Sequence, residues 1–291
     1  MLVTSAYVAL AVKEDKSMSA QRTTSSSIFM AGDGDGYELQ MGRFSRLLAP
    51  LFIDFAGIKE GARVLDVGCG TGSLAFELAR NPRIAWIEAV DFSPIYIEHA
   101  KLRGDDARLV FSVADACALP FEEESFDHTA SMLVLAFVPQ VNQAVREMRR
   151  VTKAGGRVSA AMWDVRGGLV IARMFWDTAA MLDPRAVERR ARSLSRPMTR
   201  PGDLTRAWQV AGLREVVEDM ITIRMTFSSF ENFWAPMEGK DGPFAEYVTA
   251  LSGEERTRLR DAVQIAYVDG EPDGSRSYAA TSWAVRGTVP G

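Results

Sequence analysis

Between residues 63 and 162, short apolar runs alternate with segments whose apolar residues have helical spacing. The apolar runs occupy residues 63–67, 84–90, 109–113, 126–135 and 157–162, and the helical patterns between them occupy 73–80, 94–102 and 139–153. A pair of glycines, Gly155 and Gly156, is expected to end the last of these helices. Strand and helix alternating in this way predict a parallel sheet with helices on both faces.

The C-terminal part of the chain has a different pattern. It contains helical patterns at residues 169–182, 184–194 and 201–211, strand patterns at 216–226 and 277–285, and a mostly helical stretch at 244–268. No internal repeat separates these segments. We therefore expect one α/β domain over residues 31–291, with helical insertions near 168–200 and 228–268.

The N-terminal residues are expected to form a leader outside this domain. Residues 2–12 are apolar, but they lack a preceding basic region and are too short for a bilayer, which takes about 20 apolar residues. A segment rich in Ser and Thr follows. We predict that residues 1–30 are disordered and that Met18 or Met30 is the functional start. A cleaved signal peptide is the alternative.

The composition excludes several classes of protein. Apolar residues make up 47% of the chain, which is enough for a sizeable core. The 34 basic and 38 acidic side chains give a net charge of −4, without the basic surplus that sequence-independent nucleic-acid binding needs. Cys69 and Cys117 are the only cysteines, which favours a reducing cytoplasm. With only His99 and His128, a histidine-rich metal site is not expected.

A glycine-rich loop follows the first predicted strand. Its sequence is Val-Leu-Asp-Val-Gly-Cys-Gly-Thr-Gly over residues 64–72. Glycines at this position allow the backbone to turn sharply and to approach a ligand closely. A dinucleotide-binding loop would need a third glycine at position 73, where this chain has Ser73. The spacing therefore argues against NAD.

An acidic residue in the same loop points to a different ligand. Asp66 stands two positions before the first glycine, where its carboxylate would repel a pyrophosphate. A ligand with an ammonium group would be attracted, and its own carboxylate could meet backbone amides at the start of the next helix. These residues favour an amino-acid-bearing nucleoside. A tight turn without a ligand is the alternative.

Several segments together resemble the class I S-adenosylmethionine-dependent methyltransferases, in particular the small-molecule branch that includes quinone-biosynthesis C-methyltransferases. The similarity spans residues 37–163 and is carried by the segments 64–72, 89–93, 113–120, 126–127 and 150–156. The last of these departs from the family, because Ala154 replaces a frequent proline. The resemblance implies a Rossmann-like doubly wound, mostly parallel seven-stranded sheet.

The resemblance also implies a cofactor and the residues that hold it. The cofactor would be S-adenosyl-L-methionine, with S-adenosyl-L-homocysteine as its product and no metal. Asp91, which follows Gly72 by 19 residues, would hold the ribose hydroxyls, and Asp115 would accept from the adenine amino group. A helix cap for Asp91 and an ordinary turn for Asp115 are the alternatives. The implied cofactor-binding residues are Asp66, Gly68, Cys69, Gly70, Gly72, Asp91, Phe92, Asp115, Ala116, Tyr37 and Arg43.

The acceptor side is less sharply defined by the sequence. Tyr37 and Arg43 lie on a predicted lid helix over residues 37–46, for which a plain amphipathic helix is the alternative. Asp164 is a candidate acceptor-binding residue, with a loop or helix-cap carboxylate as its alternative role. The aromatic candidates Phe175 and Trp234 could likewise belong to the core. Seven arginines between positions 185 and 206 predict a solvated helix face, or else a contact with an anionic acceptor. The candidate acceptor-binding residues are Phe137, Trp163, Asp164, Phe175 and Trp234.

No side chain is assigned as a catalytic acid or base. His128 lies in an apolar strand and is expected to be a hydrogen-bonded core residue, whereas His99 is expected on a solvent-facing helix. Asp127, which opens a strand, is expected to be structural. Because the cofactor's sulfonium already activates the methyl group, positioning and exclusion of water should dominate catalysis.

The sequence thus predicts a cytoplasmic methyltransferase that acts on a small apolar or aromatic molecule by direct in-line displacement. The alternatives are a nicotinamide-dependent oxidoreductase and a non-catalytic interaction module with the same fold. A nucleic-acid substrate and a membrane span are not expected, and a homodimer is left open.

Overall fold

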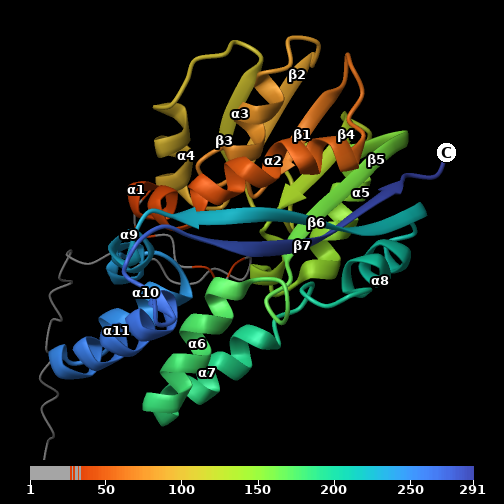
Figure 1. Cartoon of the computed structure of the whole chain (residues 1–291). Helices are drawn as coiled ribbons and strands as arrows, with labels where there is room; N and C mark the ends of the chain where they lie inside the picture. Colours follow the sequence, from red (N-terminus) through yellow and green to blue (C-terminus); the bar gives the residue numbers. More distant parts are fainter. Residues whose placement is uncertain (1–26, 28, 30–31, 33) are drawn as a thin grey trace, which may run out of the picture.

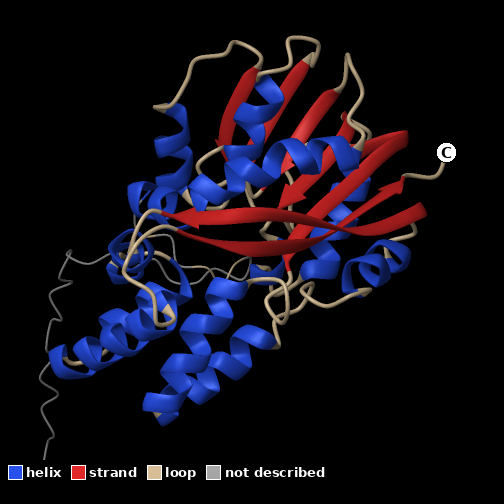
Figure 2. Ribbon diagram, in the orientation of Figure 1, coloured by secondary structure: helices blue, strands red, loops and turns tan. Residues whose placement is uncertain are grey.

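The computed structural model describes residues 27, 29, 32 and 34–291, so the leader predicted for residues 1–30 lies outside the described residues except at Ser27 and Phe29. The described residues form one sheet with the strand order β3-β2-β1-β4-β5-β7-β6 (Figures 1 and 2). Strands β1 to β5 run parallel, and β7 runs antiparallel to both β5 and β6. The predicted doubly wound, mostly parallel sheet is confirmed. The strands are β1 (Arg63–Val67), β2 (Trp86–Asp91), β3 (Leu109–Val113), β4 (Phe126–Met132), β5 (Thr152–Trp163), β6 (Arg214–Phe227) and β7 (Arg276–Thr288).

Helices cover both faces of the sheet because the parallel strands are apolar on both sides. On strand β1, Val64 packs into one core cluster and Leu65 into the other, and both side chains are fully buried. Apolar residues on both sides of a strand leave neither face for solvent. The first cluster contains residues of α2 (Arg43–Ala56), α3 (Ser73–Ala79) and α4 (Pro94–Lys101), and the second contains residues of α5 (Val141–Val151) and α8 (Asp203–Val210).

A further group of helices lies beyond the carboxyl ends of the parallel strands (Figure 1). Within this group, α6 packs against both α7 and α11. An aromatic cluster holds the group together: the Phe175 ring lies 4.9 Å from Phe244, and Trp176 lies 5.4 Å from Tyr247. The elements are α6 (Val170–Leu182), α7 (Pro184–Leu194), α9 (Phe230–Trp234), η3 (Ala235–Glu238), α10 (Gly242–Thr249) and α11 (Gly253–Val268).

The predicted lid helix at residues 37–46 is divided among three elements. They are α1 (Gly34–Tyr37), a π-helical turn η1 (Glu38–Gly42) and the first part of α2. Single π-helical turns are rare and are often found at functional sites. This turn carries part of the wall of the cavity described below.

Two predicted element boundaries are wrong for identifiable reasons. The strand predicted at 126–135 ends at Met132, because Leu133 has a left-handed backbone (φ 68°), and the 3-10 turn η2 (Leu135–Phe137) follows. Gly155 and Gly156 do not end a helix, since α5 already ends at Val151 and the glycines lie within β5. A Cβ on Gly156 would lie only 2.8 Å from the carbonyl oxygen of Asp127, so close backbone packing requires this glycine.

The remaining predicted elements form with small shifts. The strand predicted at 84–90 begins at Trp86. The stretch 244–268 is divided into α10 and α11 because Ser252 caps α11, with Glu255 completing a capping box.

Candidate functional site

One cavity lies at the carboxyl ends of the parallel strands and joins residues that are far apart in the sequence. The glycine loop after β1, the turn after β2 and the turn after β3 supply one side of it. The turn after β4, the end of β5 and the N-terminal elements supply the other side. The predicted site residues in its lining are Asp66, Gly68, Cys69, Gly70, Asp91, Phe92, Ala116, Tyr37, Phe137 and Trp163.

The glycine loop has a backbone that other residues would not adopt. Gly68, Gly70 and Gly72 have φ values of 75°, 54° and 91°, in the left-handed region that favours glycine. A Cβ on Gly68 would lie 2.4 Å from a methyl carbon of Val134, and one on Gly72 would lie 2.7 Å from the Phe76 ring. The loop therefore needs glycine both for its backbone angles and for its close packing.

Asp66 is a buried carboxyl group that no side chain in the described structure pairs with. It is 1% exposed, it lines the cavity, and neither of its carboxylate oxygens has a hydrogen-bond partner. Burial, with a smaller contribution from the charge of Asp91 and against the opposing effect of the Ala75 backbone N–H, raises the pKa of the Asp66 carboxyl to about 8. A buried carboxylate of this kind is costly unless a cation or a donor satisfies it. The arrangement suits a ligand that carries an ammonium group.

Asp91 organises the loop and faces the cavity. Its Oδ2 accepts a hydrogen bond from the Gly70 N–H at 2.8 Å, and its Oδ1 accepts one from the Ser93 N–H at 2.9 Å. Burial raises the pKa of Asp91 to about 6, against the opposing effect of these two hydrogen bonds. The N-cap of α4 is Ser93, so the alternative in which Asp91 itself caps this helix is wrong. The remaining lone pairs of Asp91 can serve a ligand with hydroxyl groups.

The raised pKa of Asp66 predicts how stability changes with pH. The folded protein holds this proton up to a pH of about 8, whereas the unfolded chain releases it near the ordinary value of 3.8. Because the folded state then binds more protons, the free energy of unfolding should fall as the pH rises through this interval. Denaturant unfolding of the ligand-free protein at pH 5 and pH 8 measures this. Asp66→Asn should flatten the profile, and an unchanged slope in that variant would contradict the assignment.

Tyr37 closes the cavity from the N-terminal side. Its ring lies 5.2 Å from that of Tyr96 and 6.5 Å from that of Phe29, and burial raises its pKa to about 12. The next residue, Glu38, accepts a hydrogen bond from the hydroxyl of Thr71 in the glycine loop. The N-terminal elements are thus tied directly to the loop that they cover.

Asp115 lies beside the cavity and outside its lining. Its Oδ1 accepts a hydrogen bond from the Cys117 N–H at 2.7 Å, which is the turn-forming role weighed as the alternative. Its neighbours Ala114 and Ala116 line the cavity. A contact between the Asp115 carboxylate and a ligand stays a prediction.

Four predicted site residues have other roles. Arg43 donates to the side chain and the carbonyl of Asn232, at 3.0 and 3.2 Å, and lies outside the cavity lining. Asp164 accepts from the backbone N–H groups of Arg166 and Gly167, as the loop alternative proposed. Two further residues are fully buried outside the cavity lining, where their rings pack against other aromatic side chains. These are Phe175 and Trp234.

Neither histidine is placed as a base at the cavity. His128 is buried, its Nε2 lies 2.8 Å from the Ser159 hydroxyl, and burial lowers its pKa to about 3, which confirms the expected core role. His99 does not face solvent as predicted: its side chain is 21% exposed and packs beneath Gly34 with its Nε2 against Asp35. Asp127 accepts from the Arg63 N–H and from Lys153, as a structural residue would.

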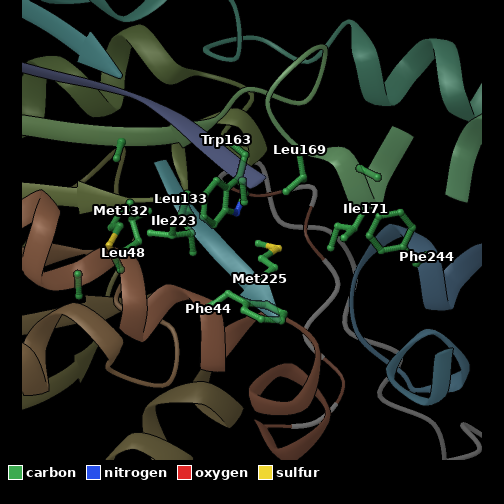
Figure 3. Packing of buried hydrophobic residues seen from close by; sticks show 14 of the residues in the cluster. Phe44, Leu48, Met132, Leu133, Trp163, Leu169, Ile171, Ile223, Met225 and Phe244 are labelled. Carbon is green, nitrogen blue, oxygen red and sulfur yellow. The ribbon is translucent and has the colours of Figure 1, made fainter. Parts of the chain in front are cut away.

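Several residues that line the cavity beside Trp163 are not predicted by the sequence. Leu169 and Phe244 line it together with Trp163, and all three belong to the apolar cluster drawn in Figure 3. Arg196, between α7 and α8, also lines it, with its guanidinium carbon 4.6 Å from the centre of the Phe137 ring. The sequence feature that could have indicated Arg196 is the arginine-rich run between positions 185 and 206. Its first interpretation was a solvated helix face.

Two further features concern the described part of the chain, residues 34–291 and the few described before them. No group of three or more His, Cys, Asp or Glu side chains in this part of the chain is placed to hold a metal ion. No helix there combines the length and the apolar character that crossing a membrane requires.

Comparisons with known proteins agree with this geometry. Residues 65–160 match the methyltransferase domain family. The chain is 29% identical over 157 residues to an uncharacterised protein of Mycobacterium tuberculosis (53% of this chain, 54% of that one). It is 38% identical over 116 residues to the methyltransferase GfsG of Streptomyces halstedii (38% and 41%). The matches span about half, or less, of the length of these curated relatives.

A solved structure extends the likeness of fold beyond the matched domain. It is the phosphoethanolamine N-methyltransferase 2 of Haemonchus contortus in complex with S-adenosyl-L-methionine, with a TM-score of 0.55 and 18% identity. The likeness covers 89% of this chain and 57% of that structure. From the match over residues 65–160 and the shared fold, this chain contains a methyltransferase domain.

Proposed function

We propose that the protein transfers a methyl group from S-adenosylmethionine to a small apolar molecule by direct in-line displacement. The observation that carries this proposal is the buried carboxyl of Asp66, which no described side chain pairs with, in the same cavity as the glycine loop. The ammonium group of the cofactor would stabilise this carboxyl in its ionised form and pair with it, whereas a diphosphate beside it would gain no ion pair and would oppose its ionisation. The name of the relative GfsG, a methyltransferase, also supports the proposal.

The acidic side chains at the cavity would each bind a different part of the cofactor. Asp66 pairs with the ammonium group of the cofactor, and Asp91 accepts hydrogen bonds from its ribose hydroxyls. Asp115 stays our proposed contact for the adenine amino group, since its neighbours line the cavity. When bound, S-adenosylmethionine supplies a methyl group already activated by a positively charged sulfur.

The apolar wall would orient the acceptor and exclude water. Trp163, Leu169 and Phe244 present hydrophobic surface to the cavity, which suits an apolar or aromatic molecule. Holding the acceptor in line with the methyl group can lower the barrier by several kcal/mol without a dedicated acid or base. The helices of residues 168–200 and 228–268 would form this acceptor side within one domain that spans residues 31–291.

The proposed location in the cell rests on the cysteines, and the proposed class of acceptor rests on the net charge. Cys69 and Cys117 are both free in the described structure, which supports action in a reducing cytoplasm. The net charge of −4 supports a small-molecule acceptor over a nucleic acid. A homodimer stays a prediction.

Calorimetry with three ligands tests the proposal against its alternatives. We expect S-adenosylmethionine and S-adenosylhomocysteine to bind and NAD to leave no signal. Binding of NAD alone would favour the oxidoreductase, and binding of none of the three would favour a non-catalytic module. Incubation of metabolite extracts with the protein and methyl-labelled S-adenosylmethionine should then give a product heavier by one labelled methyl group.

A further inference from the structure

Arg196 brings a positive charge to a cavity whose other charged side chains, among the described lining residues, are acidic. Its side chain lines the cavity beside Ser193 and lies over the Phe137 ring. No carboxylate in the described part of the chain lies within ion-pair distance of this guanidinium. Glu246 is the acidic residue with an electrostatic effect on Arg196, but its carboxylate already accepts a hydrogen bond from Arg189 at 3.0 Å. The half-buried guanidinium of Arg196 therefore lies against the Phe137 ring without a carboxylate to balance its charge.

The proposed cofactor does not need the positive charge of Arg196, because other groups of the cavity match its charged and polar groups. The acidic side chains in the lining, Asp66 and Asp91, match the ammonium and hydroxyl groups of the proposed cofactor. The N–H groups of the loop glycines and of Cys69 already have acceptors within the protein, so the carboxylate of the cofactor would be met by the first N–H groups of α3, at Ser73 and Leu74, which also line the cavity. Among the described lining residues, Arg196 is the only one with a cationic side chain. It lies on the side formed by the α7–α8 connection and the turn after β4, together with Phe137.

We propose that Arg196 recognises a carboxylate on the acceptor, so that the substrates are apolar molecules that carry one carboxylate group. This inference rests on the proposed function, since it concerns the acceptor half of the same cavity. A guanidinium binds a carboxylate through two parallel hydrogen bonds, and the surrounding apolar wall strengthens that pairing. A phosphate would bring up to two negative charges into a lining that holds Asp66, Asp91 and one cationic side chain, so a singly charged carboxylate matches the charge of Arg196 better.

Pairs of probes that differ only in charge test the inference. The probes are 2-naphthoate and 2-naphthamide, benzoate and benzamide, and decanoate and decanamide, each titrated into the protein loaded with S-adenosylhomocysteine. The variants are Arg196→Gln, Arg196→Lys and, as a matched control, Arg192→Gln, which alters an exposed arginine at the end of α7.

We expect at least one acid to bind 10-fold or more tightly than its amide in the wild type and in Arg192→Gln. Arg196→Gln should weaken that acid by about 10- to 100-fold, as expected for a lost hydrogen bond to a charged group, and leave its amide unchanged. Arg196→Lys should restore part of the preference, because it keeps the charge and loses the paired geometry.

The outcomes separate this inference from the proposed function. If S-adenosylhomocysteine does not bind to the wild type, the proposed function fails, and the acids are then titrated into the ligand-free protein. Equal binding of acid and amide in every pair, or no binding of any acid, would overturn the inference alone. Weaker binding of S-adenosylhomocysteine to Arg196→Gln would also overturn it, because Arg196 would then hold the cofactor.

Discussion

Replacement of Asp91 by alanine should weaken the binding of S-adenosylmethionine by about 3 kcal/mol, roughly 100-fold, because hydrogen bonds to a charged group are worth about 1.5–3 kcal/mol each. Two effects add in this variant. The ribose hydroxyls lose their acceptor, and the Gly70 N–H loses the Asp91 oxygen that holds it at 2.8 Å. Isothermal titration calorimetry of the wild type and the variant gives the change directly.

The control for Asp91 lies on the same strand. Glu88 is also on β2, but its carboxylate accepts a hydrogen bond from the Trp86 indole and lies outside the cavity lining. Glu88→Ala should bind the cofactor as the wild type does. If both variants bind equally well, the assignment of Asp91 to the cofactor is wrong. If both lose binding, the effect belongs to the strand and not to the carboxylate of Asp91.

The parts of the site that the sequence predicts are those held by local backbone geometry. Glycines after a buried strand allow a sharp turn and a close approach to a ligand, so they indicate a binding loop. Asp66 and Asp91 are predicted as site residues because they lie at the ends of neighbouring strands. Residues at the carboxyl ends of adjacent parallel strands must lie close together. The cavity lining contains these residues as predicted, because the strand order β2-β1-β4 brings the three strand ends together.

Residues on the inserted helices are harder to predict because their roles depend on packing between segments distant in sequence. Phe175 and Phe244 have similar chemistry, yet only Phe244 lines the cavity and Phe175 lies behind it in the aromatic cluster. Arg43 is bound to Asn232, a residue 189 positions away, and no local pattern could indicate that partner. Arg196 turns inward from an arginine-rich run whose composition alone favours a solvated face.

Replacement of Gly68 by alanine should destabilise the fold by about 3 kcal/mol, because two costs add at this position. A left-handed backbone costs an L-residue about 1–2 kcal/mol, and forcing a methyl group into a packed site costs about 1–3 kcal/mol. Gly68 has a φ of 75°, and its added Cβ would lie 2.4 Å from the branched side chain of Val134. Denaturant unfolding measures the change.

Gly61 provides a control that isolates the first of these two costs. Its φ is 76°, close to that of Gly68, but no atom lies within 4 Å of the position that a Cβ would take. Gly61→Ala should therefore lose only about 1–2 kcal/mol, the backbone cost alone. Adding Val134→Ala to Gly68→Ala should recover part of the loss by relieving the contact with Val134. If Gly68→Ala costs no more than Gly61→Ala, close packing against Val134 does not constrain the loop, and its glycines serve backbone geometry alone.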